Sequence, residues 1–560
     1  MKQSNARSIK PAQTNTRVQS LSFAELPHQS RLFLEYLRDP AALKKYYPNV
    51  TGSPSNVGKF ADEVLANYKT DRGELCDALV EINKQIGASS KTLEYIERLR
   101  AADTVAVVTG QQAGILTGPL YTIYKALSAI KLADELNKNG TKAVPVFWVA
   151  TEDHDFDEVA EIYLTDKNGE LISSQYRPQN FDDGASVGDI KLDSSIATFI
   201  DDLISHLPTT EFSADIHDLL KASYSEQSNF GESFGKTLAV LFANYGLVVI
   251  DPQHKKIKQL AAPIYEQAIK QADEIVSAIQ DRNKKLATDD FHSQVLVEDD
   301  YFPLFWHDDE GKRTALKRVS DNLYRAKDGK SEFTTAELEK IASNESRRFS
   351  PGVMLRSVVQ DYLLPTICYF GGAAEIAYFA QNGAAYKILK RPVTTIFHRQ
   401  SFTIIESRQR RVLEKLSWNL TDLFVDKEKA LVAAAERVLS PETAELFTEV
   451  EKNIETELDR LDRQLSSSDP TLATNLATRR RKIEYHIATL RKKALLSEVR
   501  KDETMRRQID DLFNSLVPNG GLQERTLNIF SFINRHGLSF IDVLYNSVEL
   551  KDKDHRIIYL

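Results

Sequence analysis

The sequence predicts an α/β protein in which a parallel sheet is followed by a long helical hairpin. Short buried strands alternate with helices in residues 104–150, and the same alternation returns in residues 238–397. After residue 425, apolar residues recur every three or four positions, which is typical of a coiled coil. Parallel neighbours in a sheet are joined by crossovers, so we expect right-handed βαβ units.

The composition predicts a folded chain of several domains. The chain has 560 residues, of which 42% are hydrophobic and 27% are charged, as in ordinary globular proteins. Its 72 basic and 80 acidic residues give a net charge of −8. A general polyanion-binding surface and a nucleic-acid partner are therefore not expected, although a local basic groove stays open.

Targeting signals in the sequence are weak. The two cysteines, Cys76 and Cys368, exclude a disulfide scaffold and a Cys-rich zinc module, and they favour a reducing compartment. Neither a membrane-length apolar run nor a secretory signal stands out, so we expect a cytoplasmic protein without a membrane partner. Residues 1–23 carry four basic residues and no acid, which leaves a transit peptide open, but Pro11 favours a flexible tail.

The first predicted elements form one βαβ unit. Residues 30–100 have the apolar spacing of helices. A strand follows at Thr104–Thr109, and a glycine-rich loop joins it to a helix at Leu120–Asn139, which Gly140 ends. A second strand, Ala143–Ala150, completes the unit.

Further strands and helices extend the α/β core. In chain order we expect a helix at 238–245, a strand at 246–252, one long helix at 254–284, a strand at 363–370, a helix at 373–389 and a strand at 393–397. Insertions are expected near residues 160–235 and 290–350, and alternating polar and apolar residues predict that 160–200 and 290–335 are β-rich. The expected domains are a core (1–425), a coiled coil (426–515) and a closing segment that packs back on the core (516–560).

The helical hairpin is predicted from its apolar seam. Residues of the first helix step by three or four positions: Phe447, Val450, Ile454, Leu458, Leu461 and Leu465. Asp469-Pro470 predicts the start of the second helix, with Asp as the cap. We expect an antiparallel coiled coil that holds a homodimer together, and an ordinary amphipathic helix pair is the alternative. The basic run Arg479–Lys482 is interpreted as a solvated face.

The glycine-rich loop is the first candidate binding site. Backbone N–H groups at the start of a helix favour an anion, and glycines allow close approach. The loop is neither a Walker A motif nor a GxGxxG fingerprint, so a plain tight turn stays open. Lys125, two turns into the helix, could reach a phosphate or simply be solvated. The candidate loop residues are Gly110, Gln111, Gln112, Gly114, Thr117 and Gly118.

A run of acids follows the second strand. Ligands of open α/β sheets bind at the carboxyl ends of the strands, which makes Asp153, His154 and Asp155 the candidate catalytic residues. If the extended geometry continues, Asp153 and Asp155 face one way and His154 the other. Such a cluster could hold an ammonium group, orient a general base or bind Mg²⁺. The alternative is a helix start decorated with acids.

Two later segments are weaker candidates. Gly371-Gly372 end a predicted strand, and Glu375 lies in the first turn of the next helix. Arg399 follows the strand that ends near residue 397. Structural and binding roles are both open for these residues, whereas Cys368 is expected to be inert core.

Three long strings resemble one known family. GQQAGILTGPLYTIYKALSAIKLADEL, VPVFWVATEDHDFDEV and LRSVVQDYLLPTICYFGGAAEIAYFAQ resemble the bacillithiol-biosynthesis cysteine-adding enzymes (BshC), as does the closing GLQERTLNIFSFINRHG. The resemblance covers nearly the whole chain. It implies a Rossmann-like core related to the nucleotidylyltransferases, and a coiled coil used for dimerisation. Ala373-Ala374 departs from an expected Gly-Pro-Ala run and puts the role of that loop in doubt.

The resemblance also implies a reaction. Such a ligase adds L-cysteine to glucosaminyl-malate to form bacillithiol, by amide formation with an activated carboxylate. We expect ATP or a related nucleotide as the cofactor, Mg²⁺ as a further candidate, and no tightly bound organic cofactor. The sequence assigns the proton of the attacking amine to His154. The alternatives are a nucleotidylyltransferase or metal phosphoesterase that uses Asp153, His154 and Asp155, and a catalytically inactive coiled-coil assembly protein.

Overall fold

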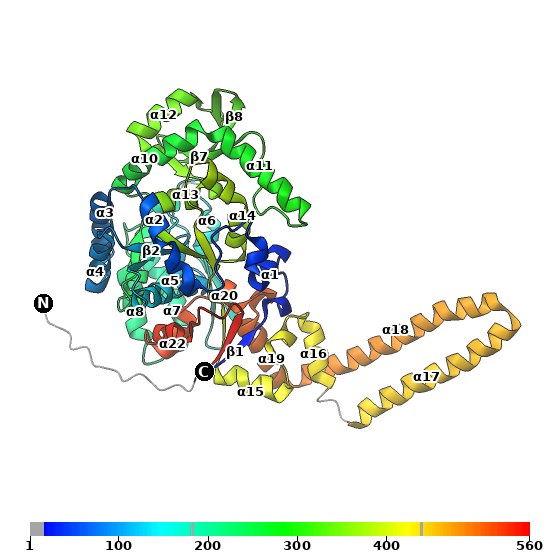
Figure 1. Cartoon of the computed structure of the whole chain (residues 1–560). Helices are drawn as coiled ribbons and strands as arrows, with labels where there is room; N and C mark the ends of the chain where they lie inside the picture. Colours follow the sequence, from blue (N-terminus) through cyan, green and yellow to red (C-terminus); the bar gives the residue numbers. More distant parts are fainter. Residues whose placement is uncertain (1–15, 180, 182–183, 437–440) are drawn as a thin grey trace. The chain divides into compact units, whose positions relative to one another are not determined.

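Five parallel strands form the central sheet (Figure 1). The computed structural model describes residues 16–179, 181, 184–436 and 441–560. The strand order is β13-β12-β2-β3-β6, and every neighbouring pair is parallel. The predicted parallel sheet is confirmed, with strand ends shifted by a few residues: β2 (Val105–Gln111), β3 (Ala143–Val149), β6 (Val248–Ile250), β12 (Thr366–Gly371) and β13 (Thr395–His398).

Two crossover helices determine where the strand order reverses. Helix α5 (Tyr121–Lys138) joins β2 to β3, and α14 (Ala373–Ile388) joins β12 to β13. The first crossover leads from β2 towards one edge of the sheet, and the second leads from β12 towards the other edge. The loops after β2 and β12 therefore begin at neighbouring strand ends. Ligands of open α/β sheets bind at such a switch point.

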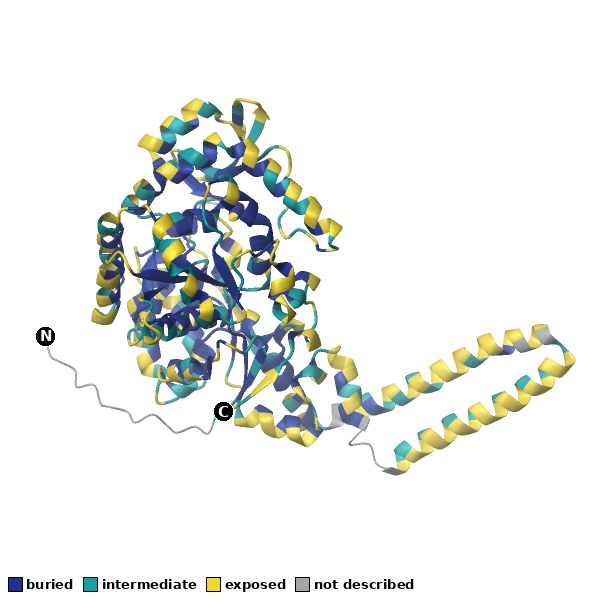
Figure 2. Cartoon of the chain, viewed as in Figure 1, coloured by how far each residue is buried: buried dark blue, intermediate teal, exposed yellow. Residues whose placement is uncertain are grey.

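The central strands are buried along almost their whole length (Figure 2). The sequences VAVVTGQ and AVPVFWV lack the alternation of a half-exposed strand, as expected for a sheet covered on both faces. At the β6 edge, the side-chain amide of Asn83 donates to Val249 O at 2.7 Å and accepts from Val249 N at 3.0 Å. Asn83 belongs to α3 (Arg72–Gln85) and occupies hydrogen-bonding groups that an edge strand would otherwise leave open.

Most of the regular elements before residue 290 are helices. Besides α3 and α5 they are α1 (Arg31–Arg38), α2 (Ala61–Asn67), α4 (Ser90–Leu99), α6 (Phe156–Ala160), α7 (Ser195–His206), α8 (Ser213–Ser223), α9 (Phe230–Leu241), α10 (Lys255–Lys270) and α11 (Ala272–Thr288). The single helix expected at 254–284 is wrong, because the chain breaks at Gln271. Helix α10 packs against α12 (Thr335–Asn344) and α13 (Val353–Leu363), whereas α11 packs against α14, so the two need different directions.

The insertions differ from each other in structure. Near residues 160–235, the described residues form one antiparallel hairpin of β4 (Glu161–Thr165) and β5 (Leu171–Gln175), and helices follow. Near residues 290–350, a second sheet has the order β10-β9-β8-β7-β11. Its strands are β7 (Tyr301–His307), β8 (Arg313–Ser320), β9 (Leu323–Ala326), β10 (Glu332–Thr334) and β11 (Phe349–Pro351). Residues 180 and 182–183 of the first insertion, and residues 1–15 of the expected tail, lie outside the described residues.

The chain divides into two compact units. The first unit contains residues 1–403 and 524–558, and the second contains residues 404–523 and 559–560. The returning segment of the first unit includes α21 (Phe530–His536), α22 (Phe540–Ser547) and most of β15 (His555–Tyr559), which belongs to the same sheet as β1 (Arg17–Leu21). Among the described residues, no helix has the length and apolar character needed to cross a membrane.

The second unit contains the helical hairpin. Its two long helices, α17 (Pro441–Ser468) and α18 (Pro470–Lys501), run side by side, and the predicted cap Asp469 accepts a hydrogen bond from Thr471 N at 2.9 Å. Ion pairs tie the helices together, among them Arg480–Asp459 at 2.5 Å. Residues 437–440 of the expected coiled coil are not described. The other helical elements of the unit are α15 (Ser407–Leu416), α16 (Lys427–Glu436) and α19 (Glu503–Leu516).

A buried polar chain ties the returning segment to the first unit. Arg399 pairs with Glu524 at 2.8 Å, and these side chains are only 4% and 2% exposed. Ser401 donates to Glu524 at 2.8 Å, so His555 Nδ1, 2.7 Å from Ser401 Oγ, must be the donor in that contact. His555 Nε2 then accepts from Thr403 Oγ1 at 2.8 Å. Burial lowers the pKa of His555 from 6.5 to about 4, although Glu524 opposes this shift.

We predict that the neutral state of His555 makes folding depend on pH. The folded pKa is the lower one, so the unfolded chain takes up the proton first as the pH falls. Stability from this group is therefore full above pH 6.5 and is lost towards pH 4, where about 3 kcal/mol is missing. Thermal or denaturant unfolding from pH 4 to pH 7 should show a weaker pH dependence in His555→Gln than in the wild type. His292→Gln, at an exposed histidine, should keep the wild-type dependence, and an unchanged slope in His555→Gln would contradict the prediction.

Candidate functional site

A cavity of about 570 Å³ opens at the carboxyl ends of the central strands. Its wall contains the loops after β2, β3 and β12, so it lies at the switch point of the sheet. The volume is within the usual range of ligand pockets. The inserted sheet and α13 complete the wall with Tyr301, Phe305, Arg313, Pro351, Val353 and Arg356.

The glycine-rich loop after β2 is held in a strained shape. Leu116 and Thr117 have φ angles of 50° and 73°, and Gly118 has 66°. Left-handed backbone at the two non-glycine residues is costly, so the surrounding structure must impose it. Asn528 does so, because its side-chain amide donates to Leu116 O at 2.7 Å and to Gly118 O at 2.6 Å. The adjoining residue Leu527 accepts a hydrogen bond from Leu120 N at 2.8 Å.

Backbone N–H groups of this loop are already engaged in several places. Gly114 N donates to Gln112 O, and Gly118 N donates to Ile115 O, both at 2.9 Å. At Gly110, close packing explains why the residue is glycine, because a Cβ there would lie 2.7 Å from Trp148 O on β3. These contacts fit the turn alternative for part of the loop. The proposal that the loop binds an anion stays a prediction.

Lys125 is buried and fully engaged rather than solvated. Its ammonium pairs with Glu375 at 2.5 Å and donates to Gly110 O and to Gln111 Oε1, both at 2.9 Å. Burial alone would raise the pKa of Glu375, but Lys125 and Arg356 outweigh it and hold the pKa below its ordinary value. Lys125 therefore ties the loop after β2 to the start of α14.

Glu375 also fixes the start of α14. Its carboxylate accepts from Gly372 N at 2.7 Å and from Tyr369 Oη at 2.7 Å. Arg356 lies 4.0 Å from Glu375 and donates to Tyr378 Oη at 2.5 Å. Among the described residues, Glu375 is the carboxylate within 4 Å of both Lys125 and Arg356, so two cations share one anion.

The shared carboxylate leaves this part of the cavity positive. One surplus positive charge faces the N-terminus of a 16-residue helix, α14, whose dipole adds further positive potential. Gly372, Ala373 and Ala374 line the cavity at that helix start. The combination predicts an anion site between Arg356 and α14.

The loop after β3 supplies negative charge to the same cavity. Asp153 accepts from Gln112 Nε2 at 2.7 Å and lies 3.4 Å from Arg313 Nη1. Burial would raise the pKa of Asp153, but the contacts with His154, Arg313 and Gln112 outweigh it and keep the carboxyl group ionised. Glu158 also lines the cavity, and burial raises its pKa.

Several predicted residues lie away from the cavity wall. The strand ends at Val149 and turns, so the extended alternation does not continue to Asp155. Asp155 is exposed and caps α6, accepting from Glu158 N at 3.4 Å. Thr117 and Gly371 are buried and do not line the cavity. Nine predicted residues do line it: Gly110, Gln111, Gln112, Lys125, Asp153, His154, Gly372, Glu375 and Arg399.

Sequence reasoning missed several residues of the wall. Arg313 and Phe305 come from the inserted sheet, far from the acid run in the sequence, and their local pattern carries no signal. Arg356 lies at the start of a candidate segment, residues 355–375, but its sequence pattern assigned it no role. Arg525 lies inside the family-like string GLQERTLNIF, which could have drawn attention to it. Among the described residues, no group of three or more His, Cys, Asp or Glu side chains is arranged to hold a metal ion.

A second cavity of about 330 Å³ adjoins the first around the glycine-rich loop. Gly114 and Gly118 line only this second cavity. Five residues line both cavities: Gln111, Gln112, Tyr121, Glu158 and Arg525.

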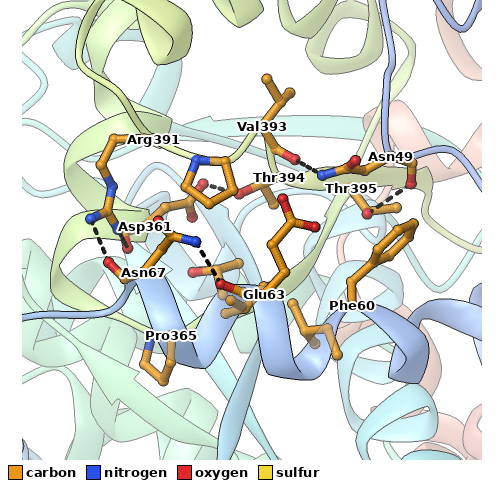
Figure 3. Close-up of a pocket in the computed structure, with 14 residues that line it drawn as sticks. Asn49, Phe60, Glu63, Asn67, Asp361, Pro365, Arg391, Val393, Thr394 and Thr395 are labelled. Atoms are coloured by element: carbon orange, nitrogen blue, oxygen red, sulfur yellow. Dashed lines mark hydrogen bonds between the residues drawn. The ribbon is translucent and has the colours of Figure 1, made fainter.

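The amino-terminal edge of the sheet holds a much smaller space. It has about 20 Å³, room for one water molecule, and lies near the starts of β12 and β13 (Figure 3). Asp361 accepts hydrogen bonds there from Tyr386 and Thr394, and Arg391 donates to Asp361 O at 2.7 Å. Burial raises the pKa of Asp361. This cluster is interpreted as a hydrogen-bonded polar part of the core, in which Arg391 Nε is left without a hydrogen-bond partner among the described residues.

Comparison with known proteins gives one consistent match. Residues 17–400 match the family model "Bacillithiol biosynthesis BshC, N-terminal Rossmann-like domain", and residues 402–560 match "Bacillithiol biosynthesis BshC, C-terminal coiled-coil domain". The protein of Koribacter versatilis named "Putative cysteine ligase BshC" is 33% identical over 96% of this chain and 99% of its own length. Proteins of the same name from Solibacter usitatus and Salinibacter ruber are 34% and 30% identical, over 95% and 94% of this chain and 98% and 96% of their own lengths.

We predict that Arg356 carries much of the anion affinity of the cavity. Arg356→Met keeps the length of the side chain and removes its charge, so binding of pyrophosphate should weaken by about 10- to 100-fold, the worth of a charged hydrogen bond. Calorimetric titration measures this change. Arg347→Met, which removes an exposed arginine lining a different cavity, should bind as the wild type does. Equal affinity in a folded Arg356→Met protein would remove the anion site from this position.

Proposed function

The chain belongs to the BshC family, and from this premise we propose that it is a ligase that joins the carboxyl group of L-cysteine to the amine of glucosaminyl-malate. Relatives that span nearly the whole chain carry the name of a cysteine ligase. Full-length coverage supports transfer of the whole activity rather than of one domain's activity. The product would be the thiol bacillithiol.

One observation carries the proposal: the charge of the cavity is segregated. Arg356 and the start of α14 make one part positive, whereas Asp153 and Glu158 supply carboxyl groups to another part, where Arg313 pairs with Asp153. Amide formation needs such a pair of subsites. The carboxyl group and whatever activates it are anionic, and the incoming amine arrives as an ammonium ion.

A nucleotide such as ATP fits the positive part. Amide formation from a carboxylate is unfavourable in water, so the acid has to be activated first. When bound, ATP would supply a phosphate-bearing leaving group on the carboxyl carbon, as an adenylate or an acyl phosphate. Arg356 and the N–H group at Ala373 would hold its anionic groups, and Mg²⁺ would accompany the phosphates.

The remaining residues hold the amine and exclude water. Asp153 stays ionised and can orient the ammonium group. Glu158 has a raised pKa, which suits a group that accepts the amine proton near neutral pH. Phe305 and Tyr301 of the inserted sheet cover the cavity with apolar surface.

We place the proposed reaction in the cytoplasm, in line with the reducing compartment that the two cysteines favour.

The protein's own thiols take no part in the proposed reaction. Both cysteines, Cys76 and Cys368, are free and buried. Burial raises the pKa of each thiol, so neither is suited to thiol catalysis. The cysteine sulfur of the product therefore comes from the substrate.

We predict that Asp153 and Asp155 differ sharply in the reaction. Purified protein is given cysteine, glucosaminyl-malate, ATP and Mg²⁺, and bacillithiol is followed by mass spectrometry. Asp153→Asn removes a charge from the cavity and should slow ligation by about 10- to 100-fold. Asp155→Asn should stay within a few-fold of the wild type, since Asn caps a helix as well as Asp.

The rival functions predict other outcomes. A nucleotidylyltransferase or phosphoesterase would consume ATP without cysteine, and an inactive assembly protein would consume nothing. Loss of ligation in Asp155→Asn alone would favour the catalytic role assigned to Asp155 from the sequence. If the purified wild type forms no product, a strain lacking the gene that still makes bacillithiol would refute the ligase.

We also propose that the hairpin joins two copies of the chain. Leu461 of α17 and Leu472 and Leu490 of α18 are 45%, 49% and 56% exposed in a single copy. Apolar residues at coiled-coil spacing are normally covered, and a two-fold partner is the common solution. The partner would cover these residues without disturbing the seam between α17 and α18.

We predict that charging this exposed stripe yields monomers. Leu461→Asp with Leu490→Asp should halve the mass measured by light scattering at micromolar concentration, with the helix content retained. Gln464→Asp adds a charge at an exposed polar position of α17 and should leave the dimer intact. A monomeric wild type, or a dimer that survives the double substitution, would disprove the arrangement.

A further inference from the structure

Arg313 reaches His154 from the inserted sheet. Its Nη1 lies 2.9 Å from His154 Nδ1. A guanidinium group has only donors, so Nδ1 of His154 must accept with its lone pair. In the neutral ring the proton then resides on Nε2. This assignment follows from the contact itself and from the chemistry of arginine.

Arg313 is held firmly enough to impose that choice. Its Nε donates to Ser350 Oγ at 3.0 Å, its guanidinium carbon lies 3.7 Å from the centre of the Phe305 ring, and the side chain is 8% exposed. Ser350 can accept because its own proton can go to His307 Nε2, which lies 2.7 Å away. Burial lowers the pKa of His307 to about 2, so His307 is a neutral acceptor.

The opposite tautomer of His154 has poor partners. A proton on Nδ1 would face the N–H of Arg313, and two donors repel each other. Asp153 Oδ1, the nearest carboxylate oxygen, is 3.5 Å from Nδ1, beyond a good hydrogen bond. The contact with Arg313 is therefore kept when Nδ1 is unprotonated.

The other ring nitrogen is available to a ligand. His154 lines the main cavity and its side chain is 41% exposed. Within the described part of the chain, no hydrogen bond to His154 Nε2 is formed. A free Nε2–H group is a donor, and it cannot accept the proton of an amine in this tautomer.

We propose that Arg313 is a positioning residue that fixes His154 as an Nε2–H donor, and that His154 donates a hydrogen bond to the carbonyl oxygen of the activated cysteine instead of acting as the general base. The donor role of His154 rests on the proposed ligase function. The positioning role of Arg313 concerns the free protein alone.

Amide formation by this route balances in electrons and protons. The ammonium group first loses one proton to solvent. The neutral amine nitrogen then forms a bond to the carboxyl carbon, and the carbonyl π electrons move to the oxygen, where His154 Nε2–H stabilises the negative charge. The amine proton passes to a carboxylate, for which Glu158 is placed on the same cavity wall. The carbonyl re-forms, and the phosphate-bearing group leaves with the electrons of its bond to carbon.

The tautomer is tested by NMR on the full chain labelled with ¹⁵N-histidine. The signals of His154 are those that disappear in His154→Gln. We expect a protonated Nε2 and an unprotonated Nδ1 in the wild type. Arg313→Met keeps an apolar stem against Phe305 but removes the donors, so the preference for Nε2–H should weaken. A protonated Nδ1 in the wild type, or an unchanged preference in Arg313→Met, overturns the positioning role.

The donor role is tested by two amide replacements in the ligation assay. The side-chain nitrogen of Gln can take the place of Nε2, whereas that of Asn reaches only the place of Nδ1. His154→Gln should keep activity within about 10-fold, and His154→Asn should lose about 100-fold or more, as for removal of one oxyanion donor. Equal losses of activity in the two folded variants would instead support His154 as the general base. If the wild type shows no ligation, the deletion strain decides the proposed function, while the NMR result still decides the role of Arg313.

Discussion

The carboxylate of Glu375 is the contact on which the rest of the site depends. It caps the first turn of α14, accepts from Tyr369 of β12 and pairs with Lys125, which in turn holds the loop after β2. Two strand ends and two crossover helices are thus fixed by one side chain. Because Arg356 shares this carboxylate, the same contact that orders the switch point also leaves it positively charged. Glu375 therefore has a structural and a binding role at once, since one positive charge stays uncompensated only while Lys125 and Arg356 share its carboxylate.

Much of the fold could be predicted because its signals are local. The strands of the central sheet are continuous apolar runs, and the crossover helix ends at a glycine with φ of 88°, Gly140. The predictions that failed depended on packing partners. The break at Gln271 separates helices that lie against different neighbours, and the described residues of the expected β-rich segment 160–200 form one hairpin before helix α7 begins at Ser195. Spacing along one segment cannot reveal which surface will cover it.

The site was predictable only in part, for the same reason. Asp153, His154 and the loop Gly110–Gln112 follow strands, so their position at the sheet edge follows from topology. The interpretation of Lys125 as solvated or phosphate-bound missed its burial, which depends on Glu375 some 250 residues later in the chain. Arg313 is a similar case: its contact with His154 joins the inserted sheet to the loop after β3, which is distant in the sequence. Side chains that act on a predicted residue from elsewhere leave no trace in its local pattern.

The glycine-rich loop obtains its shape from Asn528, and this has a consequence for biosynthesis of the chain. A ribosome completes residues 1–403, then the whole of residues 404–523, before it reaches the segment that returns to the first unit. Until then the turn at Leu116 lacks the hydrogen bonds that Asn528 donates, and Arg399 is without Glu524. A chain that stops before residue 524 therefore lacks one contact at the glycine-rich loop and another at the cavity wall. The site is completed by the segment that is synthesised last.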